Sequence, residues 1–243
     1  MARMAGSLDV SLILPTYNER ACLEKLHERI DGALSPYRHE VIVVDDSSPD
    51  GTSDLVRELG KNAPYRVISR PPHSGLSSAV LDGCQAATGT VVVVMDADGS
   101  HPPEQLAALI DPVRSGDAEF ALGSRRVPGG SDEGLSPDRQ MVSWIATVLT
   151  RPLTNVQDPM SGFFAVRREV LGRGTLNPTG FKIALEILTK CHPAPVVEVP
   201  FRFGARLAGE SKLGPNTIAS YGRHVLRLYR WRFFGPGAAS RTR

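Results

Sequence analysis

The feature that most constrains this sequence is an alternation of short, continuously apolar segments with helical patterns. The strand-like segments are Val10–Leu14, Val41–Val44, Arg66–Ile68, Val91–Met95 and Phe120–Leu122. The helical patterns between them are Glu19–Ala33, Ser53–Lys61, Ser74–Ala87 and Pro103–Arg114. Strands that are apolar at every position, rather than at alternate ones, are typical of sheets buried on both faces. The sequence therefore predicts an α/β fold with a mostly parallel central sheet and helices on both faces.

The alternation ends near Pro128. A stretch rich in Gly, Pro, Ser and Asp, from Pro128 to Asp138, predicts a long surface loop of the kind that often carries function. Beyond it, Phe163–Val166 and Val196–Phe201 are expected to add strands of a mixed sheet, with a helix near Phe181–Thr189. The chain has 243 residues and no internal repeat, so we expect a single domain over residues 1–217.

The C-terminal part of the chain is strongly basic. Of 28 Lys and Arg and 26 Asp and Glu, the segment Arg202–Arg243 holds 9 basic residues and 1 acid, which leaves 19 basic and 25 acidic residues before it. Apolar residues recur at helical spacing beside arginines, at Ile218, Tyr221, Val225 and Leu228. Residues 218–243 therefore predict a basic amphipathic helix and tail. Such a helix lies either on an anionic membrane surface or against the core with a solvated basic face, and the sequence favours neither.

Two patterns bear on the compartment. No apolar run approaches the roughly 20 residues that span a bilayer, and Met1–Ser7 has no apolar core of signal-peptide length. The three cysteines, Cys22, Cys84 and Cys191, are too widely spaced for a metal clip or a disulfide framework. We therefore expect a cytoplasmic protein, peripheral at the cytoplasmic face of a membrane if it meets one, and no nucleic-acid partner.

Polar residues follow the first three predicted strands, at Pro15–Glu19, Asp45–Thr52 and Ser69–Arg70. Ligands of doubly wound sheets bind beyond the carboxyl ends of the strands, although an Asp there is also a common turn residue or helix N-cap. The first turn lacks G-x-G-x-x-G, which argues against an ordinary dinucleotide site. Tyr17 can stack on a base, while Glu19 or Asp46 can accept hydrogen bonds from base or ribose groups.

The fourth predicted strand ends in Asp96-Ala97-Asp98-Gly99-Ser100-His101. Two carboxylates two residues apart project to one side of an extended backbone, and a divalent cation between them and a diphosphate would offset their repulsion. The sequence therefore predicts a Mg²⁺ or Mn²⁺ site at Asp96 and Asp98, with Ser100 as a further oxygen ligand; a structural turn is the alternative. His101, followed by two prolines, is more typical of a loop or the start of a helix.

Eight short motifs extend over the chain from Val10 to about Trp231. They are Leu-Pro-Thr-Tyr-Asn-Glu at 14–19, Val-Val-Asp-Asp at 43–46, Gly-Leu-Ser-Ser-Ala at 75–79, Asp-Ala-Asp at 96–98, Gly-Ser-Arg at 123–125, Asp-Pro-Met-Ser-Gly-Phe-Phe at 158–164, Gly-Phe-Lys at 180–182 and Gly-Glu-Ser-Lys at 209–212. With them the chain resembles the polyprenol-phosphate mannosyltransferases, of the dolichol-phosphate mannose synthase type within inverting glycosyltransferase family 2. The first three motifs are shared widely in that family, and the last four are more particular to the lipid-phosphate sugar synthases.

This resemblance implies a GT-A-like, Rossmann-like nucleotide-diphospho-sugar transferase fold. It implies that mannose passes from GDP-mannose to a polyprenyl or dolichyl phosphate with inversion. The guanosine would be held by Pro15, Tyr17, Glu19, Val44 and Asp46. Ribose, diphosphate and metal would be met by Asp96, Ala97 and Asp98, and the diphosphate would be clamped by Arg206 and Lys212. The acceptor phosphate would be held by Ser124, Arg125 and Arg139, although without the motifs the two arginines would be read as solvated surface charges. Asp158 and Ser161 would either order the acceptor loop or form a turn before the Phe163 strand.

The acceptor's charge suggests the mechanism. A phosphate monoester is largely dianionic near neutral pH, with a second pKa of about 6, so it needs no strong general base. Metal, Arg206 and Lys212 would neutralise the departing diphosphate. One alternative is a family-2 transferase that uses UDP-glucose or another donor, with a lipid phosphate or a sugar hydroxyl as acceptor; a hydroxyl acceptor would require a catalytic carboxylate. Another is a non-catalytic nucleotide-sugar sensor. A membrane-protein partner, or a separate membrane domain, also stays open.

Overall fold

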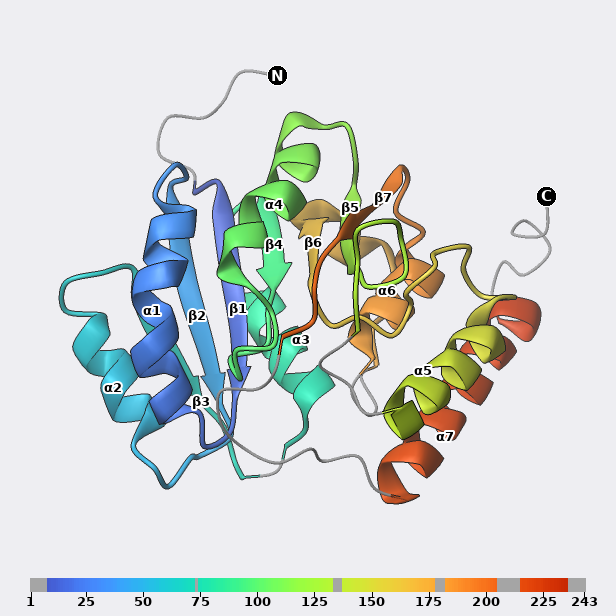
Figure 1. The fold of residues 1–243 in the computed structure, drawn as a ribbon, viewed down its shortest axis with the longest axis horizontal. Coiled ribbons are helices and arrows are strands. Elements are labelled where there is room, and N and C mark those ends of the chain that lie inside the picture. The colour runs from blue at the N-terminus through green and yellow to red at the C-terminus, as the bar shows by residue number, and fades with distance from the viewer. Residues whose placement is uncertain (1–7, 73, 133–136, 178–181, 205–214, 236–243) are drawn as a thin grey trace.

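A computed structural model of the chain describes residues 8–72, 74–132, 137–177, 182–204 and 215–235 (Figure 1). Its strands form one sheet in the order β3-β2-β1-β4-β6-β5-β7. Their bounds are β1 Val10–Thr16, β2 His39–Asp45, β3 Tyr65–Ser69, β4 Val91–Val94, β5 Phe120–Ser124, β6 Phe164–Arg167 and β7 Val196–Pro200. Neighbouring strands are parallel except where β6 pairs with β4 and β5. The predicted mostly parallel, mixed sheet is confirmed.

Helices cover both faces of this sheet. They are α1 Arg20–Leu34, α2 Thr52–Leu59, α3 Leu76–Ala86, α4 Leu106–Ser115, α5 Pro137–Thr150, α6 Ile183–Cys191 and α7 Pro215–Phe234, with short 3₁₀ turns η1 Pro103–Gln105 and η2 Arg168–Arg173. One hydrophobic cluster joins the sheet to α1 and α4, and a second joins its other face to α3 and α6. The sheet is the middle layer of three, as predicted from its continuously apolar strands.

The four valines of β4 show why these strands must be apolar throughout. Val91 and Val93 belong to the cluster under α1 and α4, whereas Val92 and Val94 belong to the cluster under α3 and α6. Successive side chains of a strand point to opposite faces, and here both faces are closed. All four valines are buried. Gly83 allows α3 to approach this sheet closely, because a Cβ there would lie 2.4 Å from Ile13 Cγ2.

Helix α5 is absent from the sequence-based prediction, which extends a surface loop to Asp138. The helix begins at Pro137, inside that predicted loop, and continues to Thr150. The part of the loop before it is pinned to the end of β7, because Ser131 N–H donates to Phe201 O and Phe203 N–H donates to Ser131 O. The large apolar side chains Met141, Trp144, Ile145 and Val148 recur at helical spacing, a pattern that the prediction overlooked, and in the structure they face outward rather than toward the core.

Helix α7 begins at Pro215, before the predicted boundary at Ile218, and it lies beside α5 (Figure 1). Its stripe residues Tyr221, Val225 and Leu228 are buried in a small cluster with residues of α5 and α6. The Tyr221 hydroxyl donates to the carbonyl of Ala146 and the Tyr229 hydroxyl donates to that of Leu149, at 2.9 and 2.8 Å. Of the two alternatives for this stripe, the structure shows docking on the core.

Leu228→Ala tests this docking. Leu228 is fully buried, so its truncation removes apolar contacts and leaves a cavity; we expect the free energy of unfolding to fall by about 2–5 kcal/mol. Leu226→Ala is the matched control on the same helix, because Leu226 is 62% exposed; we expect a change within about 0.5 kcal/mol. Urea unfolding followed by circular dichroism measures both. Equal losses in the two variants would contradict the docked position of α7.

Candidate active site

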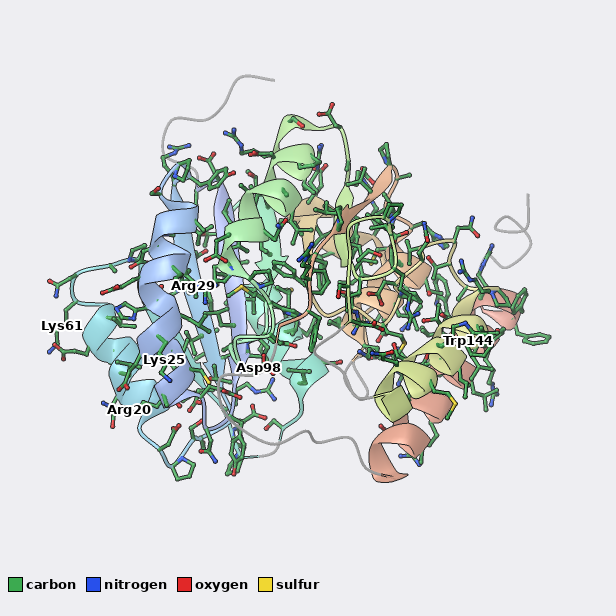
Figure 2. The ribbon with its side chains drawn as sticks, in the orientation of Figure 1. Arg20, Lys25, Arg29, Lys61, Asp98 and Trp144 are labelled. Carbon is green, nitrogen blue, oxygen red and sulfur yellow. The ribbon has the colours of Figure 1, made fainter. Side chains whose placement is uncertain are left out.

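The carboxyl ends of the parallel strands bring the predicted residues to one edge of the sheet. Thr16 pairs with Asp45, and Asp45 pairs with Ser69, so the segments after β1, β2 and β3 begin side by side. β4 pairs with β1, and the antiparallel β6 starts at this same edge. Asp98 lies beneath these strand ends in Figure 2. The described residues gathered there are Pro15, Tyr17, Glu19, Val44, Asp46, Asp96, Ala97, Asp98, Ser100, Ser124 and Arg125.

Three predicted cations are not placed by the structure. Arg206 and Lys212 fall in 205–214, outside the described residues. Arg139 lies on α5, but its side chain is also outside the described part of the chain. The predictions that these residues clamp the diphosphate and hold the acceptor phosphate therefore stay predictions.

The loop after β4 presents the two aspartates differently. The Asp96 side chain is 34% exposed. A Cβ on Gly162 would lie 3.8 Å from Asp96 Oδ2, so that carboxylate lies against a residue without a side chain. Asp98 is buried, and its Oδ1 accepts hydrogen bonds from Ser100 N–H at 3.0 Å and from Ser100 Oγ at 2.6 Å. Asp98 thus has one oxygen engaged by Ser100.

This loop fits a divalent cation that also binds substrate phosphates. Among the described residues no group of three or more His, Cys, Asp and Glu side chains is arranged to hold a metal ion alone. Mg²⁺ is usually bound through one or two carboxylates and the substrate's phosphates, rather than by an all-protein cage. The two carboxylates of Asp96 and Asp98 match that donor set. The hydroxyl of Ser100 donates to Asp98 and so orients that carboxylate, while the predicted role of Ser100 as a further metal ligand stays a prediction.

His101, directly after the acidic loop, is buried behind it and binds the backbone at its start. It is buried, and its Nδ1 accepts a hydrogen bond from the backbone N–H of Asp96 at 2.9 Å. Its ring stacks on Phe163, with centroids 4.8 Å apart. Burial lowers the pKa of this imidazole, against the opposing charges of Asp96 and Asp98. The sequence predicts only a loop or helix-start residue here, because stacking partners distant in the chain cannot be inferred from His-Pro-Pro.

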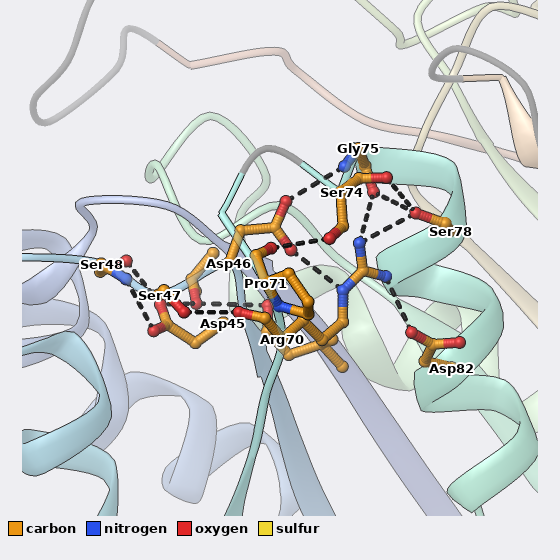
Figure 3. Close-up of polar contacts among 12 residues, drawn as sticks. Asp45, Asp46, Ser47, Ser48, Arg70, Pro71, Ser74, Gly75, Ser78 and Asp82 are labelled. Atoms are coloured by element: carbon orange, nitrogen blue, oxygen red, sulfur yellow. Dashed lines mark hydrogen bonds and ion pairs between the residues drawn. The ribbon is translucent and has the colours of Figure 1, made fainter.

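Arg70 organises the region where the base is predicted to bind (Figure 3). Its Nε lies 3.0 Å from Asp46 Oδ1, while its other nitrogens donate to Asp82 at 3.0 Å and to Ser78 Oγ at 2.9 Å. Gly75 N–H donates to Asp46 Oδ2 at 3.1 Å. The predicted guanosine ligand Asp46 is thus anchored on both oxygens. Sequence reasoning placed Arg70 at a strand end but gave it no role.

The neighbouring Asp45 supports the turn after β2. It is fully buried, and the hydroxyls of Thr16, Ser48 and Ser53 donate to its carboxylate at 3.1, 2.5 and 2.9 Å. A buried carboxylate needs such donors, because desolvation otherwise disfavours its charged form. The two aspartates of the Val-Val-Asp-Asp motif therefore have different roles. Asp45 stabilises the turn after β2, and Asp46 joins this turn to α3.

Arg125 and Asp158 form a buried ion pair beside the acidic loop. Nε and Nη2 of Arg125 donate to the two oxygens of Asp158 at 2.7 and 2.8 Å, and the Arg125 backbone N–H donates at 3.0 Å. Burial opposes ionisation of Asp158, but the hydrogen bonds and charge of Arg125 outweigh it and hold the pKa of Asp158 below its ordinary value. The Glu198 carboxylate in turn accepts from the backbone N–H groups of Gln157 and Asp158.

Two further cations at this edge were not singled out from the sequence. Lys182 donates to the carbonyl of Met160, in the turn that precedes β6. Arg126, next to Arg125, donates to Ser143 Oγ on α5 at 3.2 Å. Lys182 belongs to a quoted motif and Arg126 adjoins one, so the motifs pointed to this place, but the contacts join segments far apart in the chain.

Comparisons with known proteins agree with this architecture. A model of glycosyl transferase family 2 matches residues 11–174. Dolichol-phosphate mannosyltransferase of Pyrococcus furiosus is 48% identical over 92% of this chain and 64% of its own length. The enzyme of the same name from Saccharomyces cerevisiae is 40% identical over 93% of this chain and 89% of its own length. Glucosyl-3-phosphoglycerate synthase of Mycobacterium tuberculosis, solved with Mn²⁺, UDP and glucosyl-3-phosphoglycerate, superposes with a TM-score of 0.66 at 22% identity, over 94% of this chain and 80% of that chain.

The shared fold defines the class: a GT-A-like α/β protein with an acidic loop at the carboxyl edge of its sheet. The chain belongs to glycosyl transferase family 2, and it is a glycosyltransferase. The resemblance to the polyprenol- and dolichol-phosphate mannosyltransferases, predicted from eight motifs, is confirmed by relatives of that name over most of the chain. The chain spans 64% of the length of the Pyrococcus furiosus protein.

Asp158→Asn is expected to destabilise the protein in a pH-dependent way. At pH 7 the loss of one partner of a buried ion pair should lower the free energy of unfolding by about 3–5 kcal/mol. The folded-state pKa of Asp158 lies below the unfolded value of about 3.9, so its contribution is present above that pH and is lost as pH falls through the folded pKa. The difference between wild type and variant should therefore shrink in acid.

Urea unfolding at pH 7 and pH 3 measures this difference. Asp54→Asn is the control, because Asp54 pairs with Arg57 on an exposed helix face, with 79% and 57% of their side chains exposed. We expect that variant to change stability by less than about 1 kcal/mol at both pH values. A loss at Asp158 that is equal at pH 7 and pH 3 would rule out the ionised pair as its cause.

Proposed function

We propose that this chain transfers mannose from GDP-mannose to a polyprenyl or dolichyl phosphate, with inversion at the anomeric carbon. The observation that carries the proposal is the acidic loop Asp96–Ser100, which begins with Asp96-Ala97-Asp98, at the carboxyl edge of the sheet, in a chain similar over most of its length to named dolichol-phosphate mannosyltransferases. The edge also collects an aromatic residue, Tyr17, directly after β1, and an anchored carboxylate, Asp46, directly after β2. These groups suit a nucleoside.

Asp96 and Asp98 would hold a divalent cation, Mg²⁺ or Mn²⁺, and Ser100 would orient Asp98. Such an ion supplies charge neutralisation for the departing diphosphate. Asp96 is partly exposed and therefore accessible to the ribose and phosphates, while two hydrogen bonds from Ser100 hold Asp98 in place. Arg206 and Lys212 are proposed to share the task of neutralising the diphosphate.

The acceptor phosphate is proposed to bind near Ser124, Arg125 and Arg139. Arg125 uses two nitrogens and its backbone N–H on Asp158, so it presents a rigid guanidinium, as side chains at a preorganised anion site must. The phosphate arrives already charged, because its second pKa is about 6. The chain then needs to hold two anions in line rather than to remove a proton, and the buried ion pair keeps the position of Arg125 constant.

Because the acceptor carries a lipid tail, we expect the chain to contact a membrane, and helix α5 has an exposed apolar face that suits this contact. Met141, Trp144, Ile145 and Val148 follow helical spacing on its outer side and are 60, 58, 48 and 47% exposed. Trp144 is labelled on α5 in Figure 2. Among the described residues, no helix has both the length and the apolar content to cross a bilayer. We propose that this α5 face lies in the interface of an anionic membrane.

Helix α7 supplies the charge for such a surface. Its outer side carries Arg223 and Arg230, both exposed, together with Leu226 and Phe233. Basic residues near an anionic surface each contribute about 1 kcal/mol of attraction. The cytoplasmic face is the proposed side, since Cys22, Cys84 and Cys191 are free and buried, as befits a reducing compartment. A membrane-protein partner stays part of the proposal.

The reaction is tested by incubating the purified chain with a short polyprenyl phosphate, Mg²⁺ or Mn²⁺, and GDP-mannose, UDP-glucose or no donor. We expect a mannosyl lipid phosphate only with GDP-mannose, identified by mass spectrometry. Product only from UDP-glucose would replace the proposed donor. Donor binding without any product, even in polyprenyl-phosphate vesicles, would favour a nucleotide-sugar sensor.

Asp98→Asn and Asp98→Ala are expected to lower kcat by about 100-fold or more, because charge neutralisation at the diphosphate is lost. Asn keeps an acceptor for the two Ser100 hydrogen bonds, so that variant should also keep the fold, as judged by thermal unfolding. Asp111→Asn, on α4, is the control and should retain wild-type kcat. Near-normal metal-dependent turnover in both Asp98 variants would refute the assignment.

The membrane surface is tested with vesicles of equal phosphatidylglycerol and phosphatidylcholine. Trp144→Ser should weaken co-sedimentation, because an interfacial aromatic is lost. Arg230→Ser on α7 should weaken binding about fivefold, whereas Arg57→Ser, an exposed arginine on α2 at the opposite end of the molecule in Figure 1, should leave it unchanged. Identical binding of all variants and wild type would exclude this surface.

A further inference from the structure

His101 joins three segments of the chain in the interior behind the acidic loop. It is 2% exposed and follows the loop directly. Its ring stacks on Phe163, before β6, and meets the ring edges of Phe201 and Phe203, after β7, at centroid distances of 5.6 and 5.9 Å. Arg125 lies over the Phe203 ring, with its guanidinium carbon 5.6 Å from the ring centroid. These ring contacts alone would be enough for a histidine that serves only to pack the interior.

The imidazole, however, also makes a directed hydrogen bond. The backbone N–H of Asp96 lies 2.9 Å from His101 Nδ1. A backbone N–H can only donate, so Nδ1 must be the acceptor and the ring proton must be on Nε2. The other ring nitrogen, Nε2, lies 3.9 Å from the carboxylate oxygen Oδ2 of Asp96. The ring therefore holds the main chain of Asp96 with one nitrogen and faces its carboxylate with the other.

This bond closes the acidic loop on itself. It joins Asp96, the first residue of the loop, to His101, directly after its last, and Asp98 lies between them. Three further hydrogen bonds stiffen the loop: Ser100 donates twice to Asp98 Oδ1, and Gly204 N–H donates to Ser100 O at 3.0 Å. Of these contacts, only the His101 bond acts on Asp96. The position of that carboxylate relative to Asp98 thus depends on the imidazole.

We propose that His101 is a positioning residue that sets the spacing of the Asp96 and Asp98 carboxylates for the metal and the diphosphate. This inference rests on the proposed metal role of those two residues. His101 itself touches no substrate in this scheme; it acts through the main chain of Asp96. Groups behind a metal ligand commonly matter in this way, and their loss typically lowers metal affinity 10- to 100-fold.

Two substitutions separate the hydrogen bond from the stacking. His101→Phe keeps an aromatic ring against Phe163 but removes the acceptor for Asp96 N–H. His101→Asn removes the ring but places its Oδ1 where Nδ1 stood, so the acceptor is kept. If His101 positions the loop, His101→Phe should bind Mn²⁺ about tenfold or more weakly, while His101→Asn should stay close to wild type. If His101 only packs, the order of the two variants is reversed.

The measurement is Mn²⁺ binding to the full chain in the presence of saturating GDP, followed by the electron paramagnetic resonance of free Mn²⁺. Thermal unfolding of each variant, with and without Mn²⁺ and GDP, reports whether it is folded at the temperature of the titration. Affinity loss in His101→Phe with retention in His101→Asn supports the proposal. Wild-type affinity in His101→Phe overturns it, as does an equal loss in both variants.

Asp98→Asn is measured beside them to separate this inference from the proposed function. Loss of Mn²⁺ binding in Asp98→Asn, combined with wild-type binding in His101→Phe, overturns the role of His101 alone. Wild-type binding in Asp98→Asn contradicts the metal site itself, and the inference falls with it. In the expected result Asp98→Asn and His101→Phe both lose affinity, and His101→Asn does not.

Discussion

Burial of the sheet on both faces is the constraint on which the rest of this structure depends. In the part of the chain that the structure describes, α1 and α4 pack on one face of the sheet and α3 and α6 on the other, so neither face is open to a ligand. Ligands are therefore expected at the strand ends, whereas polar side chains within the strands, such as Ser11 and Glu40, are buried and hydrogen-bonded to each other. The parallel strands send their ends to one edge, and the antiparallel β6 begins there. Every described site residue follows from that geometry, including Asp158, which precedes β6.

The charges at this edge are used in two ways. Some are matched inside the protein: Arg70 with Asp46, and Arg125 with Asp158, all with nearly buried side chains. Buried ion pairs contribute little net stability, but breaking one leaves an uncompensated charge, so they fix geometry more than they add stability. Asp96, by contrast, is partly exposed. An edge built from rigid pairs beside an accessible acidic loop suits a charged ligand that arrives with its own cation.

Helices α5 and α7, in the second half of the chain, form the surface that is proposed to contact the membrane. Helix α7 docks its apolar stripe on α5 and α6, so the basic residues Arg223 and Arg230 lie on its free side. Helix α5 then carries apolar side chains outward, with Trp144 among them. An apolar helix face next to an arginine-bearing one is unusual for a surface bathed only in water, and it gives physical content to the proposed membrane contact.

The sequence alone determined the α/β class, the strand and helix order to Phe120–Ser124, the later elements β6, α6 and β7, and the acidic loop, because these depend on local periodicity and on residue types at strand ends. It also carried the family, through motifs. It missed α5, which begins inside the predicted loop Pro128–Asp138, and left the α7 stripe undecided. Only the tertiary structure joined Arg70 to Asp46, Arg125 to Asp158 and His101 to Asp96 and Phe163. Most of these contacts link segments far apart in the chain, and their geometry depends on how the layers pack, which no local pattern records.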